Sequence, residues 1–103
     1  MQNKVREFNQ KRNCHLEPMT VASRILDIES ELGELGKECL KCTNYGTKEF
    51  VKNDDFVLEY GDVLYSLLSL AEETGIDSDE AIEKVLKKYQ SRIDKNNSMG
   101  SGR

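Results

Sequence analysis

Two pairs of carboxylates are the residues of this sequence that could bind a metal ion. Glu31 and Glu34 form one pair, and Glu59 and Asp62 form the other, each with a spacing of i, i+3. The apolar residues around both pairs recur at helical spacing, so the two members of a pair share one helix face. Like charges at this spacing cost about 0.2–0.5 kcal/mol in an ordinary helix, and a cation would offset that cost. Oxygen ligands suit Mg²⁺, Ca²⁺ or Mn²⁺ and not Zn²⁺, so we expect a site for a hard divalent ion.

Each acidic pair lies directly beside the apolar stripe of its helix. If the two stripes pack together, all four carboxylates meet at one seam on the edge of the core. Gly33 and Gly61 lie inside the two motifs, where alanine would favour a helix by about 1 kcal/mol. A glycine at such a position indicates close approach by a neighbouring helix or a ligand. The alternative interpretation is that these acids are solvated charges flanking a core, as on most helices.

Four helical segments and no strand are predicted to position these residues. The helices span about residues 3–12, 19 or 20 to 43, 53–55 to 75, and 77–93. Asn53 is suited to an N-cap and Gly75 to a helix end, and Pro18 marks the loop before the second helix. The third helix has the broadest apolar face, so we expect it to be central. The predicted fold is an all-α four-helix bundle that homo-oligomerisation completes, forming one domain over residues 1–95, and the polar residues 96–103 are predicted to be a disordered tail.

Composition and charge exclude several classes of protein. The chain has 103 residues, of which 33% are charged and 37% hydrophobic, and its formal net charge is −4. That charge argues against a sequence-independent nucleic-acid-binding protein. No apolar run approaches the roughly 20 residues that a membrane helix needs, and the N-terminus has no apolar signal-peptide core. Three cysteines, an odd number, fit a reducing compartment, so we expect a cytoplasmic protein.

The two acidic motifs, in this order, resemble those of the MazG-like all-α nucleotide pyrophosphohydrolases. That superfamily carries Glu-x-x-Glu in one helix and Glu-x-x-Asp in the next long helix. The sequence matches this pattern together with the flanking apolar residues, over 28–35 and 58–64. The likeness extends over about residues 5–93. The chain departs from the family in having no tryptophan, which many relatives carry near the nucleotide base.

The resemblance implies a reaction and a set of metal ligands. The reaction would be hydrolysis of a nucleoside triphosphate to the monophosphate and pyrophosphate, with Mg²⁺ as cofactor and Mn²⁺ as an alternative. The implied metal ligands are Glu31, Glu34, Glu59 and Asp62. Glu31 or Glu34 could instead orient or deprotonate the attacking water, which makes these two the candidate catalytic residues.

Six further residues are candidates for binding the substrate. They are Lys37, Lys84, Lys88, Arg92, Arg12 and His15. The three on the last helix could attract phosphates, although a solvated basic face complementing the helix dipole is an alternative. Lys37 lies one turn after the first acidic motif, and His15 could stack on a base or bind a phosphate.

Other functions remain open at this point. One is phosphoribosyl-ATP pyrophosphohydrolase, which shares the acidic chemistry, and another is a non-catalytic helical module that binds nucleotides or a protein. A zinc site at Cys39 and Cys42, with Cys14 and His15, is disfavoured because the first two cysteines lie on the apolar stripe. A protomer this small would leave apolar surface exposed, so we expect a homodimer or a homotetramer.

Overall fold

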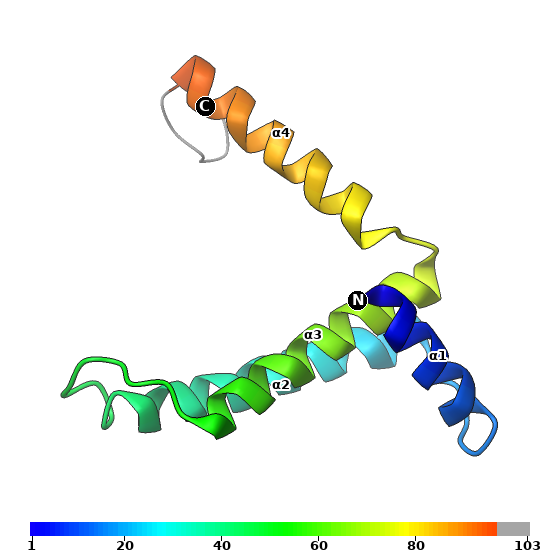
Figure 1. Cartoon of the computed structure of the whole chain (residues 1–103), viewed down its shortest axis with the longest axis horizontal. Helices are drawn as coiled ribbons and strands as arrows, with labels where there is room; N and C mark the ends of the chain where they lie inside the picture. Colours follow the sequence, from blue (N-terminus) through cyan, green and yellow to red (C-terminus); the bar gives the residue numbers. More distant parts are fainter. Residues whose placement is uncertain (97–103) are drawn as a thin grey trace.

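The computed structural model of the protein describes residues 1–96, which form four α-helices and no strand (Figure 1). The helices are α1 (Gln2–Asn13), α2 (Val21–Cys42), α3 (Asp54–Thr74) and α4 (Ser78–Asn96). The all-α class and the helix order agree with the sequence. The tail prediction falls almost wholly on residues 97–103, which lie outside the described residues. Over residues 1–96, no helix combines the length and the apolar character that crossing a membrane requires.

Local capping fixes where the helices begin and end. The Thr20 side chain accepts a hydrogen bond from the Ser23 amide and starts α2, and the Asn53 side chain accepts one from the Phe56 amide and starts α3. Each such N-cap stabilises its helix by about 1 kcal/mol. Gly75, with φ of 71°, ends α3 in the left-handed conformation that glycine adopts without strain.

Helix α3 is the central element, because α2 packs along it and α1 crosses it. Its buried residues are Val63, Ser66, Leu68, Ser69 and Ala71. The buried Asn9 ties α1 to α3, since its amide donates to the Ser69 hydroxyl at 3.0 Å and its carbonyl oxygen accepts from the Tyr65 hydroxyl at 2.6 Å. Part of this interface is therefore polar.

Helix α2 buries only part of its apolar stripe. Of the stripe residues, Cys42 is buried and Ile28 and Leu35 are half-buried, whereas Ile25 and Leu32 are 44% and 51% exposed. The other buried residues of α2 are Arg24 and Glu38. The expectation that the two apolar stripes pack together is therefore met only in part within one chain. Cys39 is exposed although it lies on the apolar stripe.

Helix α4 lies apart from the other three (Figure 1). The helix pairs that pack substantially within residues 1–96 are α2 with α3 and α1 with α3, and neither includes α4. The radius of gyration is 17.1 Å, against about 13 Å for a compact chain of 100 residues. One chain therefore does not close a four-helix bundle by itself, and its completion by oligomerisation stays a prediction.

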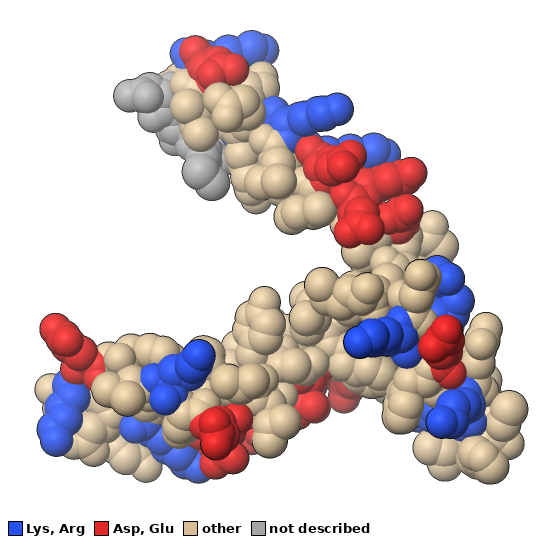
Figure 2. Space-filling model, in the orientation of Figure 1, with Lys and Arg blue, Asp and Glu red and all other residues tan. Residues whose placement is uncertain are grey.

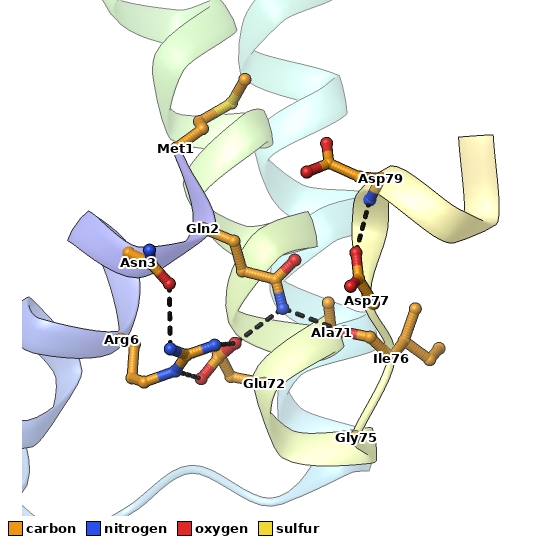
Figure 3. A pocket seen from close by; sticks show the side chains of 10 residues that line it. All are labelled: Met1, Gln2, Asn3, Arg6, Ala71, Glu72, Gly75, Ile76, Asp77 and Asp79. Atoms are coloured by element: carbon orange, nitrogen blue, oxygen red, sulfur yellow. Dashed lines mark hydrogen bonds and ion pairs between the residues drawn. The ribbon is translucent and has the colours of Figure 1, made fainter. Parts of the chain in front are cut away.

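Gln2 connects α1 to both α3 and the start of α4 (Figure 3). Its side-chain amide donates to Glu72 at 2.6 Å and to the Ile76 carbonyl at 2.9 Å, and its carbonyl oxygen accepts from the Ser78 amide at 3.0 Å. Arg6 donates two more hydrogen bonds to the same Glu72 carboxylate. Gln2, Arg6 and Glu72 line a pocket of about 380 Å³, and the hydrogen bond from the Ser78 amide joins α1 to the first residue of α4.

Candidate metal centre

The carboxylates of α2 and α3 face one another along an antiparallel seam. The Ser66 hydroxyl donates to the Asp27 carboxylate at 2.9 Å, which fixes the register of the two helices. One turn further along α2 lies Glu31, and one turn back along α3 lies Asp62. Because the helices run in opposite directions, these two residues lie opposite each other.

Three of the four predicted metal ligands come together at this point of the seam. Glu31, Glu59 and Asp62 each offer a carboxylate oxygen, and the three oxygens lie within 4.8 Å of one another. Glu31 and Glu59 are half-buried, and Asp62 is exposed. A ligand can therefore reach the cluster from solvent.

Desolvation and the charges of neighbouring acids raise the pKa values of Glu31 and Glu59. The pKa of Glu31 lies above its ordinary value, first because of desolvation and then because of the charges of Asp62 and other neighbouring acids. Desolvation likewise raises the pKa of Glu59, followed by the charges of Asp62 and Glu34. The cluster therefore repels itself when all of its members are ionised, and a cation would remove that repulsion.

Glu34 stands outside this tight group. Its side chain is 52% exposed, and its carboxylate lies 3.9 Å from the Lys37 ammonium group, whose side chain is 69% exposed. An exposed pair at that distance contributes little to stability, so both side chains remain able to turn toward a ligand.

The residues present fit a hard divalent cation. They offer carboxylate oxygens from two helices, and the cysteines and the histidine of the chain take no part in the cluster. Such a donor set suits Mg²⁺ or Mn²⁺, which bind through carboxylates and leave positions for water and substrate phosphates.

The two glycines of the acidic motifs have no neighbour that would require them. A Cβ atom built on Gly33 or Gly61 would meet nothing within 4 Å in the described part of the chain. Close approach by a neighbouring helix of the same chain is therefore the wrong explanation for these glycines. The remaining explanation for these two glycines is close approach by a ligand or by another molecule.

Comparison with known proteins decides the family. Residues 19–96, about three quarters of the chain, match the family model of the MazG nucleotide pyrophosphohydrolase domain. The chain belongs to this family. Neither the curated proteins nor the solved structures compared with it gave a match.

Membership of the MazG family supports hydrolysis of a nucleotide phosphoanhydride in general terms, and MazG enzymes generally use a divalent metal. The matched segment contains α2, α3 and α4 and hence all four predicted metal ligands. It excludes α1, which carries Arg12.

Arg12 and His15 line a pocket of their own at the end of α1. Its volume is about 430 Å³, and Phe8 and Leu16 contribute apolar walls. His15 is exposed, and Arg12 donates hydrogen bonds to Asn13 and to the Glu17 carbonyl. The structure thus places these two candidates together, and none of the four carboxylates lines their pocket.

The three basic candidates of the last helix lie on α4. Lys84 and Lys88 are exposed, and the Lys88 ammonium group lies 5.4 Å from the centre of the Tyr89 ring. Figure 2 shows uncharged side chains along much of the edge of α4 that faces α2 and α3, whereas charged side chains, acidic as well as basic, gather on its other edge. Within one chain, α4 does not bring Lys84, Lys88 or Arg92 to the acidic seam.

Sequence reasoning did not single out Arg24, the most deeply buried charged residue of α2. Arg24 is 1% exposed. Its guanidinium lies 3.9 Å from the Glu73 carboxylate and 5.8 Å from the centre of the Tyr65 ring. Two of its nitrogens have no hydrogen-bond partner among the described residues. Arg24 and Asp27 lie one turn apart on the side of α2 that carries Glu31. This spacing was the signal in the sequence that could have placed Arg24 beside the seam. Because charged residues are rarely fully buried, the residue type instead favours a surface position.

Proposed function

We propose that the chain is a Mg²⁺-dependent nucleoside triphosphate pyrophosphohydrolase. It would cleave an NTP or dNTP to the monophosphate and pyrophosphate, and Mn²⁺ would substitute for Mg²⁺. The observation that carries this proposal is the convergence of Glu31, Glu59 and Asp62 inside a MazG domain. The proposed ligand set also includes Glu34.

The residues around the ion would have distinct tasks. When bound, Mg²⁺ would neutralise the triphosphate and lower the pKa of the attacking water. Glu59 and Asp62 would fix the position of the ion from α3. Glu31, whose pKa is raised, and the exposed Glu34 are suited to orient the water and to accept its proton. Lys37 would leave its weak contact with Glu34 to meet a phosphate.

The pocket at the end of α1 is our candidate for the nucleotide base. Phe8 and Leu16 give it apolar walls, and His15 can stack on a ring or hydrogen-bond to it. This part of the chain lies before the matched segment, so the base preference would be set by residues outside it.

We further propose that the protein works as a homodimer or homotetramer. Apolar side chains are exposed on α4, including Ile82 (53%) and Leu86 (57%), and on α2 and α3, including Leu32 (51%) and Leu58 (67%). A second copy would cover both sets. It would also allow Lys84, Lys88 and Arg92 of one chain to approach the acidic seam of another.

The test is to incubate the protein with each nucleoside triphosphate and Mg²⁺ and to separate the products by chromatography. Monophosphate and pyrophosphate are expected, and hydrolysis in oxygen-18 water should label the monophosphate. Diphosphate with labelled orthophosphate would contradict the proposal. Turnover of phosphoribosyl-ATP alone would indicate that narrower enzyme, and nucleotide binding without pyrophosphate release would indicate a non-catalytic module.

The site assignment has its own test. Glu34→Gln and Asp62→Asn should each lower the activity by about 100-fold or more, since even residues that only support metal ligands cost 10–100-fold when changed. Circular dichroism should show an unchanged helical fold. Glu29→Gln is the matched control, because Glu29 is exposed on another face of α2. Activity should require Mg²⁺ or Mn²⁺, be low with Ca²⁺ and vanish with a chelator, and wild-type turnover in both site variants would contradict the assignment.

A further inference from the structure

Arg24 carries an unpaired hydrogen-bonding edge inside the protein. Its side chain is 1% exposed. Nε and Nη2 lie on the same edge of the guanidinium group, and both are inaccessible to solvent and have no hydrogen-bond partner among the described residues. Two parallel N–H groups on such an edge fit a ligand with two adjacent acceptor atoms. A buried charged donor without an acceptor is costly, so we expect an acceptor pair to bind here.

The neighbours of Arg24 do not supply that acceptor pair. The Glu73 carboxylate lies 3.9 Å from Nη2, which is beyond hydrogen-bonding distance, and the Glu73 side chain is 28% exposed. The Tyr65 ring lies 5.8 Å from the guanidinium carbon and presents its face. The Tyr65 hydroxyl donates to Asn9 and is thus already engaged.

Arg24 lies where the far end of a bound nucleotide would reach. Arg24 and Glu31 share one side of α2 and are about 10 Å apart along the helix axis. That distance matches the span from the α-phosphorus of a nucleotide to the far edge of its base. The contact of Phe8 with Tyr65, at 5.9 Å between ring centres, connects this part of the seam with the candidate base pocket at the end of α1.

We propose that Arg24 selects guanine-type bases by donating hydrogen bonds from Nε and Nη2 to O6 and N7 of a 6-oxopurine. This inference rests on the proposed nucleotide hydrolysis, and it adds a base-reading residue inside the matched segment. Arginine binds this acceptor pair through two hydrogen bonds, whereas adenine carries an amino group in place of O6. Uracil and thymine have no two adjacent acceptors, and the acceptor pair of cytosine lies near the sugar and away from Arg24.

The base would reach Arg24 when α1 moves aside. Helix α1 is tied to α3 through the polar side chains of Gln2, Arg6 and Asn9, and its Phe8 is 56% exposed. Segments with few buried apolar contacts open at a low cost in free energy. Two new hydrogen bonds to a previously unpaired edge would then favour the form with the base bound.

Nucleotide analogues test the contact on the unchanged chain. Isothermal titration calorimetry measures the binding of dGMP, dAMP and 7-deaza-dGMP, which has a C–H group in place of N7. We expect dGMP to bind at least about tenfold more tightly than dAMP, since a bidentate arginine contact discriminates between bases by that order. We expect 7-deaza-dGMP to bind about tenfold more weakly than dGMP, because it loses one charge-assisted hydrogen bond. Equal binding of dGMP and 7-deaza-dGMP would overturn the inference.

Variants of Arg24 separate base reading from a structural role. Arg24→Lys and Arg24→Gln should lose the preference for dGMP over dAMP and still bind dAMP. Arg6→Gln is the matched control, because it removes another arginine of the α1–α3 junction, which contacts Glu72, and should keep the preference. A lower thermal midpoint of Arg24→Gln with the wild-type preference would show a structural role only and would overturn the inference. If both Arg24 variants fail to fold, the comparison of dGMP with 7-deaza-dGMP decides.

The outcomes also distinguish this inference from the proposed reaction. If dGMP binding depends on Arg24 and N7 while no triphosphate is hydrolysed, the base assignment stands and the proposed reaction fails. If dGTP and dATP are hydrolysed to monophosphate and pyrophosphate with equal kcat/KM, the reaction stands and the base assignment fails. Tighter binding of dCMP than of dGMP would likewise overturn the base assignment.

Discussion

At the scale of single residues, carboxylate pKa values are shifted in opposite directions at two places in the chain. In the acidic seam, desolvation and then the charges of neighbouring acids raise the pKa values of Glu31 and Glu59. At the α1–α3 junction the pKa of Glu72 is lowered, because Arg6 and Gln2 donate hydrogen bonds to its carboxylate and the Arg6 charge adds to their effect. The acids of the seam therefore have a donor set that suits a divalent cation, whereas the Glu72 carboxylate is already bound by Arg6 and Gln2.

The lowered pKa of Glu72 predicts how its contribution to stability depends on pH. The folded-state pKa lies below the unfolded value of about 4.3, so the contribution is present above that pH and is lost as the pH falls through the folded pKa. Glu72→Gln should lower the thermal midpoint by a few degrees at pH 7. The difference from wild type should shrink below about pH 4.

Thermal unfolding followed by circular dichroism at several pH values measures this difference. Glu83→Gln is the control, because it removes an exposed carboxylate from α4 and should leave the midpoint nearly unchanged across the same range. A wild-type midpoint for Glu72→Gln at pH 7 would show that the contacts with Arg6 and Gln2 do not stabilise the fold.

At the scale of elements, local signals predicted the helices well. Asn53 and Gly75 bound α3 as expected, and the α2 prediction differs from the structure by a residue or two at each end. The acidic pairs were predicted to meet, and three of the four carboxylates do. These features depend on capping and periodicity, which operate within a few residues.

The buried face of α2 and the placement of α4 could not be predicted from the sequence, because both depend on contacts between residues far apart in the chain. Periodicity identified an apolar stripe on α2, but the buried residues of α2 include Arg24 and Glu38, and Ile25 and Leu32 of the stripe are exposed. A residue pattern shows which side of a helix is apolar, and it does not show whether the same chain or another one covers that side. The placement of α4 was missed for the same reason.

The open space around the two motif glycines gives a prediction for α2 and α3. Gly33→Ala and Gly61→Ala should each raise the free energy of unfolding of the metal-free protein by up to about 1 kcal/mol, since alanine favours the helix and its Cβ meets nothing nearby. Urea unfolding measures this gain. The same variants should bind the triphosphate more weakly if the space is needed by the substrate.

Gly36→Ala is the control for both measurements. Gly36 is also open, but it lies outside the two acidic motifs, so its variant should gain stability and keep triphosphate binding. Loss of stability in Gly33→Ala would instead show that its methyl group meets part of the same chain.

At the scale of the whole molecule, the extended shape and the exposed apolar faces belong together. The radius of gyration exceeds that of a compact chain because α4 projects from the remainder. The same projection leaves Ile82, Leu86 and Ile93 with 38–57% of their surfaces exposed. A second copy that inserts along α4 would make the assembly compact.

Leu86→Glu should therefore weaken self-association by more than tenfold, since a carboxylate buried without a partner costs well over 1.4 kcal/mol. Sedimentation velocity over a range of concentrations measures the change. Ser91→Glu introduces the same charge on another face of α4 and should leave the association intact. A wild-type protein that stays monomeric at all concentrations would contradict the proposed assembly.

Because α4 lies apart from the other helices, its helicity should depend on the protein concentration. A helix of 19 residues without tertiary packing is marginally stable in water, because most helical stability in proteins comes from a packed apolar face. If a second copy provides that face, mass action makes the helicity of α4 depend on concentration. In dilute solution its backbone amides would exchange with solvent far faster than those of α3, although both belong to one chain. Dilution alone would then reduce the far-ultraviolet helix signal and leave the seam between α2 and α3 folded.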